Sequence, residues 1–249
     1  MRRVVLTLAA LTIALGGAAR AEDVDAKKVI EKAIKAHGGA ETLAKFKDKS
    51  TILKGKMNIN VMGGLDATME MFAGGKKFKQ VLRFSVMGMD FTQEVGFDGK
   101  EMWIALNGKV IMTITGKDLD AIKESIHAEE MAGLALLGDK GLEFSTIGES
   151  KLGDQELIGI RVSKKDHKDV SLFFDKKTGL LAKMENRNLD FQTKEEVNEE
   201  RIVHDYKDID GLKRPTRVVM NRDGKKFIEM EITEQKFVDR LDDGTFDKP

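Results

Sequence analysis

The 249-residue sequence has no cysteine and only two prolines, Pro215 and Pro249. Without cysteine the chain has neither disulfides nor thiolate metal ligands, so its core must be stable without covalent cross-links. Lysine plus arginine and aspartate plus glutamate number 42 each, so no net basic field attracts nucleic acid. After residue 21 no apolar run approaches the roughly 18 residues that cross a bilayer. These absences, with no Ser/Gly-rich linker, predict one domain, no nucleic-acid partner and no permanent membrane anchor.

The first 21 residues have the pattern of a secretory signal peptide. Arg2 and Arg3 precede a largely apolar run over 4–15, and small residues lead to an Ala-x-Ala site that ends at Ala21. This run is too short for a permanent anchor. We therefore expect Sec-type export, cleavage before Glu22, and a single periplasmic domain over 22–249. Because the segment carries three arginines and no acid, the formal charge falls from 0 to −3 on cleavage.

The segment 24–46 has the apolar spacing of a helix with a break in the middle. Asp25 is a candidate cap for its start. Gly38 and Gly39, which follow His37, end the first helix, because glycine accepts the left-handed conformation that stops helices. Two short helices are therefore expected to meet at a corner.

A second helical pattern covers 115–137. Polar residues, His127 among them, share one face, and we interpret His127 as a surface histidine. The last residues, 131–137, are apolar on every side. Such a helix end must be covered by another part of the protein.

Most of the remaining sequence alternates apolar and polar residues with a period of two, as half-buried strands do. Met57, Ile59 and Val61, for example, alternate with polar neighbours. Turn pairs such as Asn107-Gly108 separate the runs, because Asn and Gly readily supply the positive φ of tight hairpins. The pattern predicts a mainly β protein (α+β) with roughly a dozen antiparallel strands.

The sequence offers no recognisable catalytic or metal-binding motif. His127 lacks a second histidine at helical spacing, and His204 and Asp205 are neighbours in a strand, where side chains point to opposite faces. The segment 206–217 imitates part of a calcium loop but places Tyr206 and Arg217 at its end positions, where neither side chain can bind calcium. We therefore expect no enzyme activity, no cofactor and no metal, with a hydrolase based on His127 or His204 as a minor alternative.

Methionine is abundant, with 13 in the sequence. Five of them fall on the apolar phase of the early strands: Met57, Met69, Met71, Met89 and Met102. A flexible, polarizable face of this kind suits apolar ligands of varied shape. The same spacing is also typical of a plain protein core, so both interpretations stay open here.

Five segments resemble the LolA-like family of periplasmic lipoprotein-sorting and lipid-carrier proteins. They are AHGGAETL at 36–43, GFDGKEMW at 96–103, LFFDKKTGLL at 172–181, YKDIDGLKRPT at 206–216 and LDDGTF at 241–246. Each is mostly turn chemistry, but together they span nearly the whole chain in the expected order. The resemblance implies one large antiparallel sheet curved into an incomplete barrel. Its concave face receives acyl chains, and the N-terminal helices and a lid helix over 117–137 cover it.

The sequence thus predicts a carrier for lipid or lipoprotein acyl chains. We expect this carrier to be a monomer that exchanges its cargo with envelope membrane proteins. The alternative is a non-catalytic envelope interaction module whose core is closed. On the carrier hypothesis, the residues expected to line the apolar interior are Met57, Ile59, Val61, Met69, Met71, Phe84, Met89, Phe91, Met102, Ile122, Met131 and Leu134.

Overall fold

The computed structural model describes residues 25–60, 63–135, 137, 140–190, 193 and 195–249. The expected signal peptide, 1–21, and Val61 lie outside the described residues. The helices are α1 (Ala26–Ala36), α2 (Ala40–Phe46) and α3 (Leu119–Ala132), with the short 3-10 turns η2 (Gly116–Asp118) and η3 (Asp243–Phe246). The strands are β1 (Ser50–Ile59), β2 (Leu65–Gly74), β3 (Lys77–Val86), β4 (Met89–Phe97), β5 (Met102–Leu106), β6 (Lys109–Ile114), β7 (Leu142–Leu152), β8 (Gln155–Lys164), β9 (Val170–Asp175), β10 (Leu181–Leu189), β11 (Glu196–Ile209), β12 (Leu212–Arg222) and β13 (Lys225–Val238).

The strands form one antiparallel sheet, in the order β6-β5-β4-β3-β2-β1-β13-β12-β11-β10-β9-β8-β7. Two meanders, β1 to β6 and β7 to β13, are joined side by side where β1 pairs with β13. The sheet is not closed, because β6 and β7 are its two edges. This confirms the expected fold class of a single large antiparallel sheet in an open, half-barrel form.

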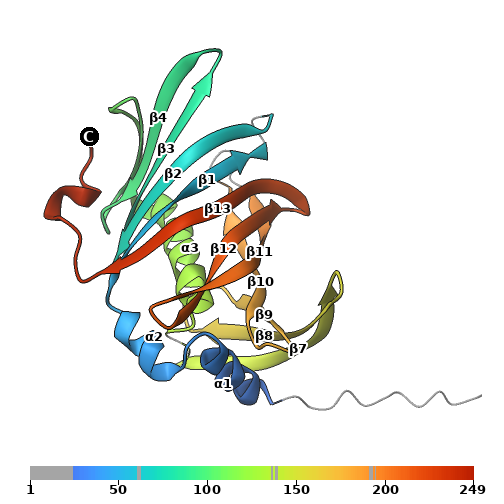
Figure 1. Ribbon diagram of the computed structural model, residues 1–249. Coiled ribbons are helices and arrows are strands. Elements are labelled where there is room, and N and C mark those ends of the chain that lie inside the picture. Colours follow the sequence, from blue (N-terminus) through green and yellow to red (C-terminus); the bar gives the residue numbers. More distant parts are fainter. Residues whose placement is uncertain (1–24, 61–62, 136, 138–139, 191–192, 194) are drawn as a thin grey trace, which may run out of the picture.

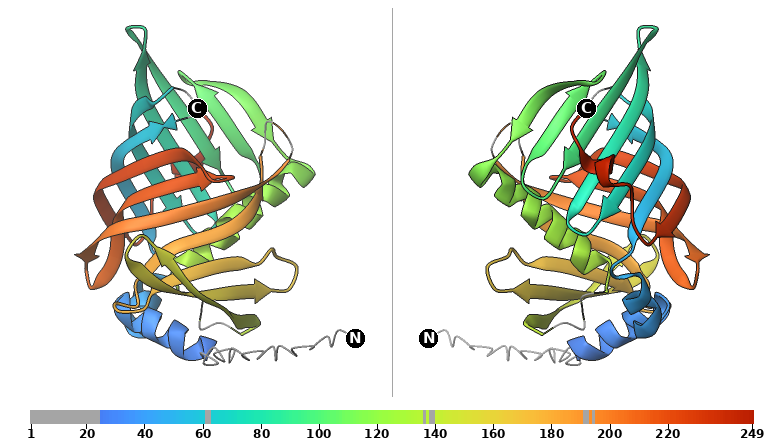
Figure 2. Two further views of the ribbon diagram at one scale, coloured as in Figure 1. Left: turned by 90° about the vertical axis from the view of Figure 1, so that its right-hand side faces the viewer. Right: turned by 90° about the vertical axis from the view of Figure 1, so that its left-hand side faces the viewer.

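The sheet curves around α3, while α1 and α2 lie together at one end of the molecule, with α1 beside β7 and β8 (Figures 1 and 2). α3 connects the two meanders and crosses the concave face. It is shorter than the sequence predicts: it ends at Ala132, and Leu134 adopts a positive φ of 63° that ends helical geometry. Within the described residues, no helix has the length and apolar character needed to cross a bilayer.

The apolar end of α3 is covered, as the sequence requires. Met131, Leu134 and Leu137 are almost completely buried, at 0%, 1% and 3% exposure. They pack with β8, β9 and β12 and with α1 in the largest core cluster. The other half of α3 places Ile122 against Met102 and Phe97 in a second cluster. α3 therefore seals much of the concave face.

The corner between α1 and α2 forms as the sequence predicts. Asp25 caps α1 by accepting a hydrogen bond from the Lys27 backbone N–H at 3.0 Å. At the other end His37 is buried: its Nδ1 lies 2.8 Å from the Ala33 carbonyl oxygen, and its Nε2 lies 3.4 Å from the Leu181 backbone nitrogen. This pattern fits a neutral imidazole that donates from Nδ1 and accepts at Nε2. The histidine thereby ties α1 to β10.

Burial makes this tie sensitive to pH. Desolvation lowers the pKa of His37 from 6.5 to about 4; the hydrogen bond to Ala33 opposes that shift and the charge of Arg214 adds to it. Between these values the unfolded chain binds a proton that the folded protein excludes, so stability falls as the pH drops from 6.5 to 4. We expect His37 alone to account for a loss of about 3 kcal/mol.

Urea unfolding at several pH values, for the wild type and for His37→Gln, checks this expectation. The wild type is expected to be the more stable protein at pH 7, and the gap is expected to close toward pH 4, because glutamine does not titrate. Parallel stability curves for the two proteins would show that His37 is not excluding a proton.

Candidate functional site

Among the described residues, an apolar patch on the concave face is built from strands alone. Met57 lies opposite Ala67 on β2 and Met230 on β13, and Met69 lies opposite Leu82 on β3. Residues opposite each other in antiparallel strands point to the same face. We call the resulting set the methionine cluster: buried Met57, Ala67, Met69 and Leu82, bordered by partly buried Ile59, Phe84, Ile228 and Met230.

The methionine cluster faces the same side of the sheet as α3. On β12, Val218 lies opposite Met230 and belongs to the core cluster that contains the end of α3. On β3, Phe78 alternates in phase with Leu82 and packs against the cluster that contains Ile122 of α3. The two α3 clusters therefore flank the methionine cluster on one continuous concave surface.

The structure distributes the predicted lining residues over these three clusters. Met57, Ile59, Met69 and Phe84 lie in or beside the methionine cluster, Met102 and Ile122 lie beneath the first half of α3, and Met131 and Leu134 lie at its end. Met71 and Phe91 are half-buried, and the Phe91 ring stacks on Phe84 with centroids 5.7 Å apart. Met89 is 58% exposed beside the β3–β4 turn, outside all three clusters, and Val61 is not described.

Polar contacts, as well as apolar packing, hold α3 to the sheet. Glu129 of α3 forms an ion pair with Arg201 of β11. Ser125 of α3 accepts a hydrogen bond from the Asn188 side chain at 2.6 Å. Sequence reasoning did not find these residues, because single polar residues on separate elements leave no periodic signal. Polar contacts of this kind can be exchanged for contacts with water at low net cost.

Two arginines place positive charge on the concave side. Desolvation is the largest single influence on the pKa of Arg201 and lowers it, but the charge and hydrogen bond of Glu129, together with the charge of Glu199, raise the pKa above its ordinary value. For Arg214 of β12, desolvation is the largest influence and lowers the pKa, only partly offset by Tyr206 and Glu129. The Nε atoms of both guanidinium groups are buried and have no acceptor among the described residues. Around Arg201 and Arg214 the interior therefore has more hydrogen-bond donors than acceptors.

His127 is not the surface histidine that its helical phase predicts. It is 2% exposed, and its ring stacks on His167 of the β8–β9 turn with centroids 4.1 Å apart. Glu124 anchors that turn by contacting His167 Nδ1 at 3.1 Å and by accepting the Lys168 N–H at 2.8 Å. Burial, followed by the nearby charges of His167 and Lys164, lowers the pKa of His127. Over the part of the chain that the structure describes, no three His, Cys, Asp or Glu side chains are placed to hold a metal ion.

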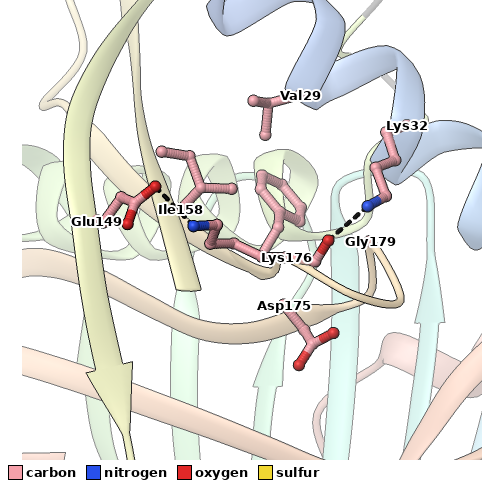
Figure 3. A pocket seen from close by; sticks show the side chains of 8 residues that line it. Val29, Lys32, Glu149, Ile158, Asp175, Lys176 and Gly179 are labelled. Carbon is pink, nitrogen blue, oxygen red and sulfur yellow. Dashed lines mark hydrogen bonds and ion pairs between the residues drawn. The ribbon is translucent and has the colours of Figure 1, made fainter. Parts of the chain in front are cut away.

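Two hollows are candidates for ligand binding on the basis of their volume. One of about 170 Å³ lies under α1, with an apolar wall of Val29, Ile158 and Phe174 (Figure 3). Its rim is fixed by Lys32, which donates to the Lys176 carbonyl at 2.5 Å, and by the ion pair between Lys176 and Glu149 at 2.6 Å.

The other, about 690 Å³, borders the strands of the methionine cluster, and Met57, Ala67 and Phe84 form part of its wall. The rest of its lining is polar or charged, such as Lys56, Arg83 and Glu231, which alternate with the concave-face residues and so lie on the outer face. Neither hollow has the long apolar wall of an acyl-chain site. The concave face beneath α3 is therefore the candidate site.

Comparison with known proteins supports the fold. No family model and no curated protein sequence matches the chain. Among solved structures, a LolA superfamily protein from Nitrosomonas europaea superposes over 90% of this chain and 98% of its own, with a TM-score of 0.53 and 12% identity. A DUF1329 family protein from Desulfovibrio piger covers 89% of this chain and 97% of its own, with a TM-score of 0.53 and 14% identity. The chain therefore has a LolA-like fold, as the resemblance of its segments implies.

Proposed function

We propose that the protein is a periplasmic carrier that encloses an acyl chain of a lipid or lipoprotein between the methionine cluster and α3. The observation that carries the proposal is the composition of that cluster: over the described residues, its buried and bordering members come from β1, β2, β3 and β13 and from no helix. A continuous apolar face with flexible methionine side chains can reshape around a hydrocarbon chain.

Burial of methylene groups supplies the driving force. Each buried CH₂ contributes about 0.8 kcal/mol, so a sixteen-carbon chain offers on the order of 12 kcal/mol before the cost of ordering it and of displacing α3. Breaking the contacts of Glu129 and Ser125 with the sheet is a small part of that cost, because water replaces both. Envelope membrane proteins that hand over the cargo would complete the cycle.

Uptake of a fluorescent sixteen-carbon fatty acid, checked by native mass spectrometry, tests the proposal. Wild-type protein is expected to bind one chain, and Met69→Glu, which places a carboxylate on the apolar wall, is expected to weaken binding at least about tenfold. The matched control is Met87→Glu, because Met87 is 95% exposed at the β3–β4 turn. Circular dichroism verifies that both variants are folded. No uptake by the wild type, or equal uptake by the two variants, would refute the carrier function.

A further inference from the structure

We propose that Arg214 binds the anionic headgroup of the ligand, so that the cargo is an amphiphile with a carboxylate or phosphate at one end and an acyl chain at the other. This inference rests on the proposed carrier function and adds the chemical class of the ligand. It follows from the place of Arg214 in the fold and from the balance of buried charges around it.

Arg214 lies on the concave side of β12. Leu212 and Val218, which alternate in phase with it along the strand, are buried in the main core. The positive charge of Arg214 acts on His37 and Tyr206, whose rings are in edge contact at 5.6 Å. Glu129 of α3 acts on Arg214 in turn. The guanidinium group therefore lies between α3 and the α1–α2 corner, on the surface that carries the methionine cluster.

The nearby acceptors already have partners. Glu129 forms its ion pair with Arg201. Glu199, the other acid that acts on Arg201, is held by Arg222, with its Oε1 2.8 Å from Nη2 and 2.9 Å from Nε. The Tyr206 hydroxyl donates to the Leu181 carbonyl at 2.8 Å.

Among the residues that the structure describes, no carboxylate lies within ion-pair distance of Arg214, and its Nε has no acceptor. Glu129, the acid that acts on both guanidinium groups, forms its ion pair with Arg201, so the charge of Arg214 has no ion-pair partner within this part of the structure. An interior cation without a partner is costly, and a guanidinium group is well matched to the two oxygens of a carboxylate or phosphate. A bound anionic headgroup would remove that cost, while its chain extends over the methionine cluster. A binding site for an anionic headgroup would therefore account for the unpaired arginine.

Binding of palmitate, hexadecyl phosphate and hexadecanol, measured by displacement of a neutral fluorescent probe, separates headgroup from chain. The wild type is expected to bind both anions at least about tenfold more tightly than the alcohol, as expected for a charge-assisted pair. Arg214→Met is expected to lose this preference while its affinity for hexadecanol stays unchanged, and Arg214→Lys is expected to retain a preference. The matched control is Arg217→Met, on the outer face of the same strand, where Arg217 pairs with Glu229 at 2.8 Å.

The outcomes distinguish this inference from the function on which it rests. If the wild type binds none of the three compounds, the carrier function fails. If it binds all three equally and Arg214→Met changes nothing, the carrier function stands and the headgroup site is wrong. The thermal midpoint without ligand is a further readout: Arg214→Met is expected to match or exceed the wild type, because an unpaired cation is removed. A large drop, absent in Arg217→Met, would assign Arg214 a purely structural role.

Discussion

Cross-linking α3 to β11 is expected to abolish ligand uptake. Because the chain has no cysteine, the double variant Glu129→Cys/Arg201→Cys introduces the only thiols, at the two positions where helix and sheet already meet. A short reducible bis-maleimide joins them. With α3 held against the sheet, a fatty acid has no route to the methionine cluster, and its exchange rate is expected to fall by at least about two orders of magnitude, as for lids that control access.

Reduction of the cross-link provides the internal control, because uptake is expected to return in the same sample. Each single-cysteine variant, treated with the same reagent, controls for modification of the site. The double variant without reagent is expected to exchange ligand at least as fast as the wild type, since the ion pair that holds α3 is gone. Rapid uptake by the cross-linked protein would mean that the ligand does not enter beneath α3.

Gly38→Ala is expected to be strongly destabilising. Gly38 has a φ of +122°, and a Cβ at this position would lie 2.3 Å from the carbonyl oxygen of Gly211. The adjacent hydrogen bond from the Lys213 N–H to the His37 carbonyl, 3.2 Å, keeps the two backbones together. Backbone strain and the clash should together cost about 3 kcal/mol or more. Urea unfolding measures the loss.

The neighbouring glycine is the matched control. Gly39 also has a positive φ, +87°, but a Cβ there would meet nothing within 4 Å. Gly39→Ala should therefore cost about 2 kcal/mol, from backbone strain alone, because its φ of 87° and ψ of 162° form a conformation essentially restricted to glycine. Equal losses for the two variants would show that the close approach to Gly211 does not decide the stability of this corner.

Most of the fold was predictable because alternation, turn residues and helix caps are properties of neighbouring residues in the sequence. Alternating runs separated by pairs such as Asn107-Gly108 become hairpins in the structure, where Asn107 and Gly108 have φ values of 49° and 74°. The break at Gly38 and the cap at Asp25 are also properties of a few neighbouring residues. By contrast, the pairing of β1 with β13 joins the two ends of the chain, and no local pattern encodes it.

The candidate site was only partly predictable for the same reason. Alternation placed Met57 and Met69 on one face, but it could not say which part of that face α3 would cover. It also placed His127 among polar neighbours, whereas a histidine from the β8–β9 turn covers its ring. The ion pair between Glu129 and Arg201 and the unpaired charge of Arg214 exist only because the sheet folds around α3. These are long-range contacts, and periodicity does not report them.

Methyl NMR of the methionines tests the enclosure of an acyl chain most directly. Protein labelled with ¹³C at the methionine methyl groups is titrated with stearate that carries a nitroxide near the end of its chain, and each signal is assigned by substitution. We predict that the signals of Met57 and Met69 broaden first and are restored by unlabelled palmitate, while that of Met87, 95% exposed, stays sharp. Broadening of Met87 alone, with Met57 and Met69 untouched, would place the chain on the surface and contradict the account.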